Sequence, residues 1–125
     1  LGNTYDKKGK AKPRKNQSSE VLFVERICEF LKPGTGKAAI VLPDGILTNS
    51  SSQYVRDFIL EKFQLLAVIS LSKDAFAHFG AGVNASVVFL RKKNHDEVTD
   101  YDPVFMENLS SSATMQPAVR PFKIN

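Results

Sequence analysis

Two glycine-containing segments raise the question of nucleotide binding. The first, Pro33-Gly34-Thr35-Gly36-Lys37, contains the Gly-Lys pair of a phosphate-binding loop. Such a loop also needs a glycine five residues before that pair and a hydroxyl residue after it, where this chain has Leu31 and Ala38. A phosphate loop also leads from a strand into a helix, whose N-terminus holds the anion, whereas here a helical pattern leads into a strand pattern. The segment therefore predicts a helix-to-strand turn without a nucleotide.

The second glycine segment, Gly80-Ala81-Gly82, precedes a strand pattern rather than a helix, so it predicts a turn and not a dinucleotide or S-adenosylmethionine loop. His78 and His95 have no partners at metal-ligand spacing, and solvated loop positions are expected for both, although His78 also lies near a possible site mouth. Cys28 is the only cysteine, which excludes an internal disulfide and a multi-cysteine zinc site and fits a reducing cytosol. Its place in a helical apolar pattern predicts a small core residue rather than a nucleophile.

Asp44 is the acidic residue whose position favours contact with a ligand. It follows the end of a predicted strand, and open α/β sheets bind ligands beyond the carboxyl ends of their strands. Two interpretations remain open: Asp44 orients a substrate, or it caps the turn that leads into Ile46 and Leu47.

The net charge of +4 is concentrated at the N-terminus. Residues 1–16 carry six basic residues against Asp6, a balance of +5, so the rest of the chain sums to −1. The basic residues are Lys7, Lys8, Lys10, Lys12, Arg14 and Lys15. Such a segment fits DNA-backbone phosphates, which it would neutralise with release of counterions, and equally fits a solvated mobile loop.

The apolar pattern predicts one helix followed by alternating strands and helices. Residues 1–19 lack apolar periodicity and predict a basic flexible loop, with Ser18 or Ser19 capping the helix that follows. That helix ends at Pro33-Gly34. Its predicted apolar stripe comprises Val21, Val24, Ile27, Cys28 and Leu31, widened by Leu22, Phe23 and Phe30.

Three strands are expected after this helix. Residues 38–42 read as a strand buried on both faces of a parallel sheet, residues 51–63 as a helix, and residues 65–71 as a second buried strand. Residues 84–90 follow after a loop too short for a crossover helix, so they predict an antiparallel third strand. This order indicates an α/β fold. Residues 93–125 predict a weakly ordered edge segment and tail, with an edge strand or short helix at 104–106.

Three segments together carry a family resemblance. Leu42-Pro43-Asp44-Gly45-Ile46-Leu47-Thr48-Asn49 looks like a fifth-strand turn, Ser52-Gln53-Tyr54-Val55-Arg56-Asp57 like the next helix, and Lys32-Pro33-Gly34 like the preceding helix stop. With the order of elements, they resemble the C-terminal half of an adenine-N6 DNA methyltransferase domain, above all that of the methylation subunit of type I restriction-modification systems. The resemblance covers about residues 20–92 and, more weakly, 100–106. Residues 1–19 correspond to the variable basic loop after the catalytic motif.

The resemblance implies the C-terminal half of a doubly wound, Rossmann-like fold with an antiparallel last strand. The intact enzyme would transfer a methyl group from S-adenosylmethionine to the N6 amine of adenine in DNA. The chain contains no Asn-Pro-Pro-aromatic motif, and no strand leads through a glycine-rich loop into a helix. We therefore expect no catalytic, cofactor-binding or metal-binding residues in this chain, and no activity from the chain alone.

The resemblance also implies a role for Phe76. In the family, the target adenine is flipped from the duplex and stacks on aromatic rings, one of which lies in the loop after the sixth strand. Asp74-Ala75-Phe76, ahead of the strand at residues 84–90, matches that pattern. Stacking on an aromatic ring contributes roughly 1 to 3 kcal/mol per base and offsets the cost of unstacking. The alternative is that Phe76 is a core residue at a strand end.

The implied partners are DNA, a specificity subunit and a restriction subunit, and the expected location is the cytoplasm. The chain has no stretch of roughly 18 to 20 apolar residues and no signal-peptide pattern, so no association with a membrane is expected. Two other readings stay open: a non-catalytic α/β binding module, and a fragment of a methyltransferase that acts on another substrate. A truncated module should expose apolar sheet surface and associate, whereas a complete module should melt cooperatively as a monomer.

Overall fold

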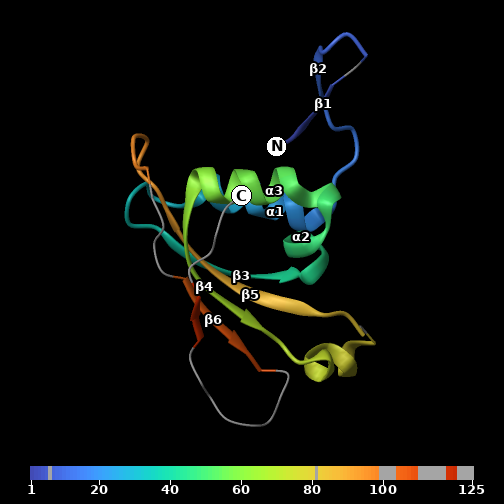
Figure 1. The fold of residues 1–125 in the computed structure, drawn as a ribbon, viewed down its shortest axis with the longest axis vertical. Helices are drawn as coiled ribbons and strands as arrows, with labels where there is room; N and C mark the ends of the chain where they lie inside the picture. The colour runs from blue at the N-terminus through green and yellow to red at the C-terminus, as the bar shows by residue number, and fades with distance from the viewer. Residues whose placement is uncertain (6, 81, 99–103, 110–117, 121–125) are drawn as a thin grey trace.

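The computed structural model describes residues 1–5, 7–80, 82–98, 104–109 and 118–120 (Figure 1). Strands and helices alternate after a short N-terminal hairpin. In chain order the elements are β1 (Asn3–Tyr5), β2 (Ala11–Pro13), α1 (Ser19–Phe30), β3 (Lys37–Pro43), α2 (Asp44–Thr48), 3-10 helix η1 (Ser50–Ser52), α3 (Gln53–Lys62), β4 (Phe63–Ser70), 3-10 helix η2 (Lys73–Phe79), β5 (Ala85–Lys92), β6 (Val104–Asn108) and β7 (Ala118–Arg120).

The main sheet has the strand order β3-β5-β4-β6-β7. β5 pairs antiparallel with both β3 and β4, so β3 and β4 run in the same direction without touching. The α/β class and the antiparallel strand at 84–90 are thus confirmed. The prediction that residues 38–42 form a strand buried on both faces of a parallel sheet is wrong. β3 pairs antiparallel, is an edge strand in the described part of the chain, and exposes Lys37, Ala39 and Val41.

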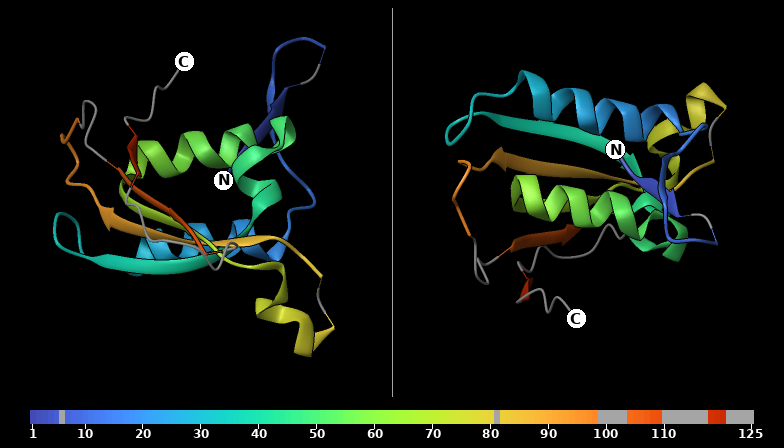
Figure 2. Two further views of the ribbon diagram at one scale, coloured as in Figure 1. Left: turned by 60° about the horizontal axis from the view of Figure 1, so that its bottom comes forward. Right: turned by 90° about the horizontal axis from the view of Figure 1, so that it is seen from above.

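Both long helices lie on one face of the sheet, as the views in Figures 1 and 2 agree. The alternation of side chains along each strand explains the single core, because alternate residues of a strand point to the same face. The core is made by Val21, Val24 and Cys28 of α1, Val55 and Ile59 of α3, and Leu42, Phe63, Val88 and Leu90 of the strands. At the far end of β5, the Lys93 ammonium donates a hydrogen bond to the Leu60 carbonyl in the last turn of α3, at 2.7 Å.

α1 begins where the sequence predicts, but its apolar stripe is narrower. Ser18 occupies the predicted N-cap position, but its side chain makes no capping hydrogen bond. Leu22, Phe23 and Phe30 are 51%, 63% and 78% exposed, which overturns the expectation that they widen the buried stripe.

Two terminal segments also differ from expectation. Residues 1–19 were expected to form a loop, yet β1 and β2 pair antiparallel across Thr4 and Lys12 to form a small hairpin. Residues 104–106 belong to a strand, but β6 lies inside the sheet, parallel to β4 on one side and antiparallel to β7 on the other. β7 falls in the predicted tail, whereas residues 110–117 and 121–125 of that tail lie outside the described residues. The helices α2 and η2, both short, were not predicted.

Candidate functional site

Two short helices, α2 and η2, lie at the carboxyl ends of β3 and β4. α2 follows β3 directly, and η2 follows β4 after Leu71 and Ser72. Because β3 and β4 run in the same direction, these two elements lie at the same end of the sheet, where β5 begins (Figure 1). This is the end at which open α/β sheets bind ligands.

Asp44 is held at this end by three hydrogen bonds. Its backbone N–H donates to the Asn84 carbonyl at 3.0 Å, and its own carbonyl accepts from the Thr48 hydroxyl at 2.8 Å. Its carboxylate Oδ1 accepts a hydrogen bond from the Ser86 hydroxyl at 2.9 Å. Asp44 is the first residue of α2, and this last bond directs its carboxylate toward Ser86 of β5.

Phe76 lies in η2 and is half-buried. It is not among the residues of the hydrophobic core cluster. Gly80 ends η2 with φ +73°, a left-handed conformation that glycine adopts without strain. Phe76 and Asp44 thus lie in the two helices that follow β4 and β3, at the same end of the sheet.

The basic residues occupy the hairpin and the segment after it. Lys7, Lys8 and Lys10 lie in the connection between β1 and β2, Lys12 on β2, and Lys15 beyond it, all of them exposed. Arg14 differs: it is half-buried, and its guanidinium carbon lies 4.0 Å from the centroid of the Tyr54 ring on α3. The hairpin projects beyond the helices, away from the sheet (Figure 1).

The glycine-rich turn at residues 33–37 has a structural role. Gly34 has φ +82° and donates its N–H to the Lys92 carbonyl at 2.9 Å. Gly36 donates to the Lys32 carbonyl at 2.8 Å, and a side chain at Gly36 would meet the Lys32 backbone at 2.7 Å. These N–H groups are turned into the protein, so they are not arranged to hold a phosphate.

Cys28 is buried, and burial raises the pKa of its thiol, although the nearby Lys92 and Lys62 act in the opposite direction. The thiol therefore stays protonated and packs as a core residue. His78 and His95 are exposed. Within the described ranges, no three histidine, cysteine, aspartate or glutamate side chains come together as metal ligands would.

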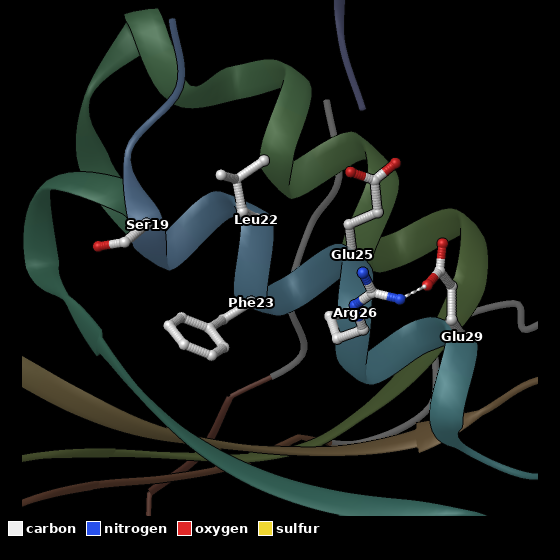
Figure 3. Close-up of a pocket in the computed structure, with 6 residues that line it drawn as sticks. All are labelled: Ser19, Leu22, Phe23, Glu25, Arg26 and Glu29. Carbon is white, nitrogen blue, oxygen red and sulfur yellow. Dashed lines mark hydrogen bonds and ion pairs between the residues drawn. The ribbon is translucent and has the colours of Figure 1, made fainter.

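A shallow pocket lies on the outer side of α1 (Figure 3). Its lining residues all come from that one helix, and the exposed pair Arg26 and Glu29 forms an ion pair across 2.8 Å at one end. The pocket is lined by Ser19, Leu22, Phe23, Glu25, Arg26 and Glu29. A depression built by one helix lacks the convergent polar groups of a ligand site, so the end of the sheet remains the better candidate.

Sequence reasoning missed Ser86. The signal available was a serine within the otherwise apolar run Ala85-Ser86-Val87-Val88, at a position where the strand faces the core.

None of the helices in the described segments has the length and apolar character needed to cross a bilayer.

Comparison with known proteins identifies the family. The sequence model of the N-6 DNA Methylase family matches residues 2–123, nearly the whole chain. The chain belongs to the N-6 DNA Methylase family.

Solved structures share this family member's fold. A candidate class I S-adenosylmethionine-dependent methyltransferase from Listeria monocytogenes is 26% identical, with a TM-score of 0.61, over 78% of this chain and 29% of its own. The M protein of the type I restriction enzyme EcoKI is 28% identical, with a TM-score of 0.58, over 71% of this chain and 19% of its own.

A third structure, the modification subunit of a candidate type I restriction enzyme from Vibrio vulnificus YJ016, is 25% identical. Its TM-score is 0.57, over 70% of this chain and 19% of its own. The chain thus spans about a fifth to a third of the length of the solved proteins that it matches.

The residues described here do not form a cradle for S-adenosylmethionine. In the described ranges, the glycine turns at 33–37 and 80–82 both lead into strands, β3 and β5. Among the described elements, α2 is the α-helix that follows a strand directly at the candidate end of the sheet, and it is five residues long. We therefore assign none of the described residues to this cofactor.

Proposed function

We propose that the protein of which this chain is part methylates adenine at N6 in DNA, as the methylation subunit of a type I restriction-modification system. The observation that carries the proposal is the family match over residues 2–123. S-adenosylmethionine would supply the methyl group. The family match favours this function over a non-catalytic binding module. A protein that methylates DNA would act in the cytoplasm.

Within this reaction, the chain contributes one wall of the base pocket. Phe76, half-buried in η2 beyond the carboxyl end of β4, offers a ring on which the flipped adenine stacks. Asp44, beyond the carboxyl end of β3, offers a carboxylate to the substrate. The lysines of the hairpin contact DNA phosphates, and Arg14 joins them from its place on Tyr54. A specificity subunit and a restriction subunit complete the assembly.

Methylation itself is tested with the intact protein, labelled S-adenosylmethionine and duplex DNA. Label recovered in N6-methyladenine supports the proposal. Label found in cytosine, in protein or nowhere, in the presence of the specificity subunit, contradicts it.

The role of Phe76 is tested by Phe76→Ala in the same intact protein. Loss of stacking should lower kcat/KM on duplex DNA by about 5- to 150-fold and leave the Kd for S-adenosylmethionine unchanged. Phe76→Tyr should keep most of the activity, because it keeps the ring. Phe30→Ala is the matched control, since Phe30 is 78% exposed on α1.

A mismatched target adenine sharpens this test. A mismatch lowers the cost of unstacking the base, so the defect of Phe76→Ala should shrink on that substrate. An equal fall in cofactor affinity, or a defect that a mismatch leaves unchanged, would show that Phe76 is a packing residue.

A further inference from the structure

Among the residues that the structure describes, Ser86 is the one polar residue that is buried, at 4% exposure. Its neighbours on the same face of β5, Val88 and Leu90, belong to the hydrophobic core. A buried hydroxyl needs a hydrogen-bond partner. Ser86 finds it in the Asp44 carboxylate, 42 residues away in sequence, at 2.9 Å.

This contact is not needed to join the two segments. The Asp44 N–H already donates to the Asn84 carbonyl at 3.0 Å, and β3 pairs with β5 along its whole length, from Lys37↔Arg91 to Pro43↔Ala85. Replacing both Ser86 and Asp44 by apolar residues of similar shape would remove the polar pair, a change that can be nearly neutral for stability. The Ser86 hydroxyl instead fixes the direction of the Asp44 side chain.

One oxygen of the Asp44 carboxylate accepts a hydrogen bond from the protein, and the other is available to a ligand. Oδ1 accepts from Ser86, and within the described ranges no donor reaches Oδ2. Asp44 is half-buried at the ligand-binding end of the sheet, and the Thr48 hydroxyl fixes its backbone carbonyl at 2.8 Å. A carboxylate held in this way is an oriented acceptor.

We propose that Ser86 is a positioning residue that aims the Asp44 carboxylate at an N–H group of a DNA base. The inference rests on the proposed function. A carboxylate accepts hydrogen bonds and repels phosphate, and neither the phosphates nor the sugars within a DNA strand carry a donor. The base edges are therefore the part of the substrate that Asp44 can recognise.

The experiment is a mutant cycle in the intact methyltransferase: Ser86→Ala, Asp44→Ala and the double variant. Each single variant should lower kcat/KM for duplex DNA by about 10-fold, and the double variant should be no worse than Asp44→Ala. The Kd for S-adenosylmethionine should stay within about twofold of the wild-type value. Ser86→Thr, which keeps the hydroxyl, should retain most of the activity.

Ser70→Ala is the matched control. Ser70 is the Cα partner of Ser86 on the adjacent strand β4 and is itself half-buried, so the same small change is made at the same level of the sheet. It should leave the DNA kinetics unchanged. Thermal unfolding of every variant separates loss of fold from loss of positioning, because a structural hydroxyl would move Tm and leave kcat and KM in place.

Three results would overturn the proposal. Multiplying defects in the double variant would mean that Ser86 acts independently of Asp44. Normal kinetics with a lower Tm would leave Ser86 a structural role only. A raised Kd for S-adenosylmethionine in Asp44→Ala would assign the carboxylate to the cofactor. The proposed function fails separately, if the wild-type protein makes no N6-methyladenine; the Kd of each variant for duplex DNA would then still decide the positioning.

Discussion

The guanidinium carbon of Arg14 lies 4.0 Å from the centroid of the Tyr54 ring, and this contact ties the N-terminal hairpin to helix α3. Gly2 lies against the same ring, since a side chain there would meet Tyr54 at 2.6 Å. The segment that carries the proposed DNA-contacting lysines is thus attached to the folded body at Tyr54, and also at α1, where the Leu1 ammonium donates a hydrogen bond to Glu25 Oε1 at 2.9 Å.

Replacing Tyr54 with alanine should loosen this hairpin. A cation–π contact of this kind contributes about 0.5 to 1 kcal/mol, and its loss should speed hydrogen exchange of the β1 and β2 amides by a few-fold. Tyr54→Phe keeps a ring and should exchange as the wild type does. Lys15→Ala, beside Arg14 but exposed, is the control. Unchanged exchange in Tyr54→Ala would show that strand pairing and the contacts of Leu1 hold the hairpin without this ring.

The two phenylalanines that end α1 and begin β4 should respond in opposite ways to truncation. Phe63 is 1% exposed and Phe30 is 78% exposed. Phe63→Ala should cost about 3 to 5 kcal/mol through lost burial and a cavity, whereas Phe30→Ala should change the free energy of unfolding by less than about 0.5 kcal/mol. Urea denaturation measures both. A large cost at Phe30 would reveal that a further part of the protein covers this side of α1.

Glu97 should contribute an acid-sensitive part of the stability. Hydrogen bonds from Arg91 and from the Asn94 backbone N–H lower the pKa of the Glu97 carboxyl. Since the folded pKa is the lower one, the stabilisation is present above the unfolded value, about 4.3, and is lost as pH falls through the folded pKa. Glu97→Gln should therefore flatten the fall in Tm on the acid side of about pH 4.3. Parallel wild-type and Glu97→Gln curves across that range would refute the assignment.

The salt dependence of DNA binding should show whether Lys7 and Lys15 contact phosphates. If both neutralise DNA phosphates, the variant Lys7→Gln, Lys15→Gln should reduce the slope of log K against log salt by about 1.8, because each contact contributes about 0.9. Lys32→Gln, at an exposed position after α1, should leave the slope unchanged. The same slope in wild type and double variant would mean that the hairpin lies away from the DNA.

The sequence was sufficient where the structure depends on local periodicity. The spacing of Val21, Val24 and Cys28 placed the buried face of α1, and the short connection after residue 71 gave β5 its antiparallel direction. The same reasoning overestimated burial at Leu22 and Phe23, because the width of an apolar stripe depends on which partners cover it. Helical spacing contains no information about those partners.

Strand order and the site contacts could not be read in this way. β3 resembles a strand buried on both faces in composition, but its burial depends on β5, which begins more than 40 residues later. The hairpin has only three residues in each strand, too few for a visible alternation. The link from Ser86 to Asp44 needs the folded sheet, so only the odd serine in an apolar run pointed to it.

The central position of β5 has a consequence for synthesis on the ribosome. Among the described strands, β3 pairs only with β5, and β4 pairs with β5 and β6, so both wait for partners that are translated later. Of the strands described in this chain, none is therefore available to pair with β3 or β4 when they leave the ribosome. A nascent chain that stops before Ala85 cannot assemble any part of this sheet, and in that interval it is a natural client for chaperones.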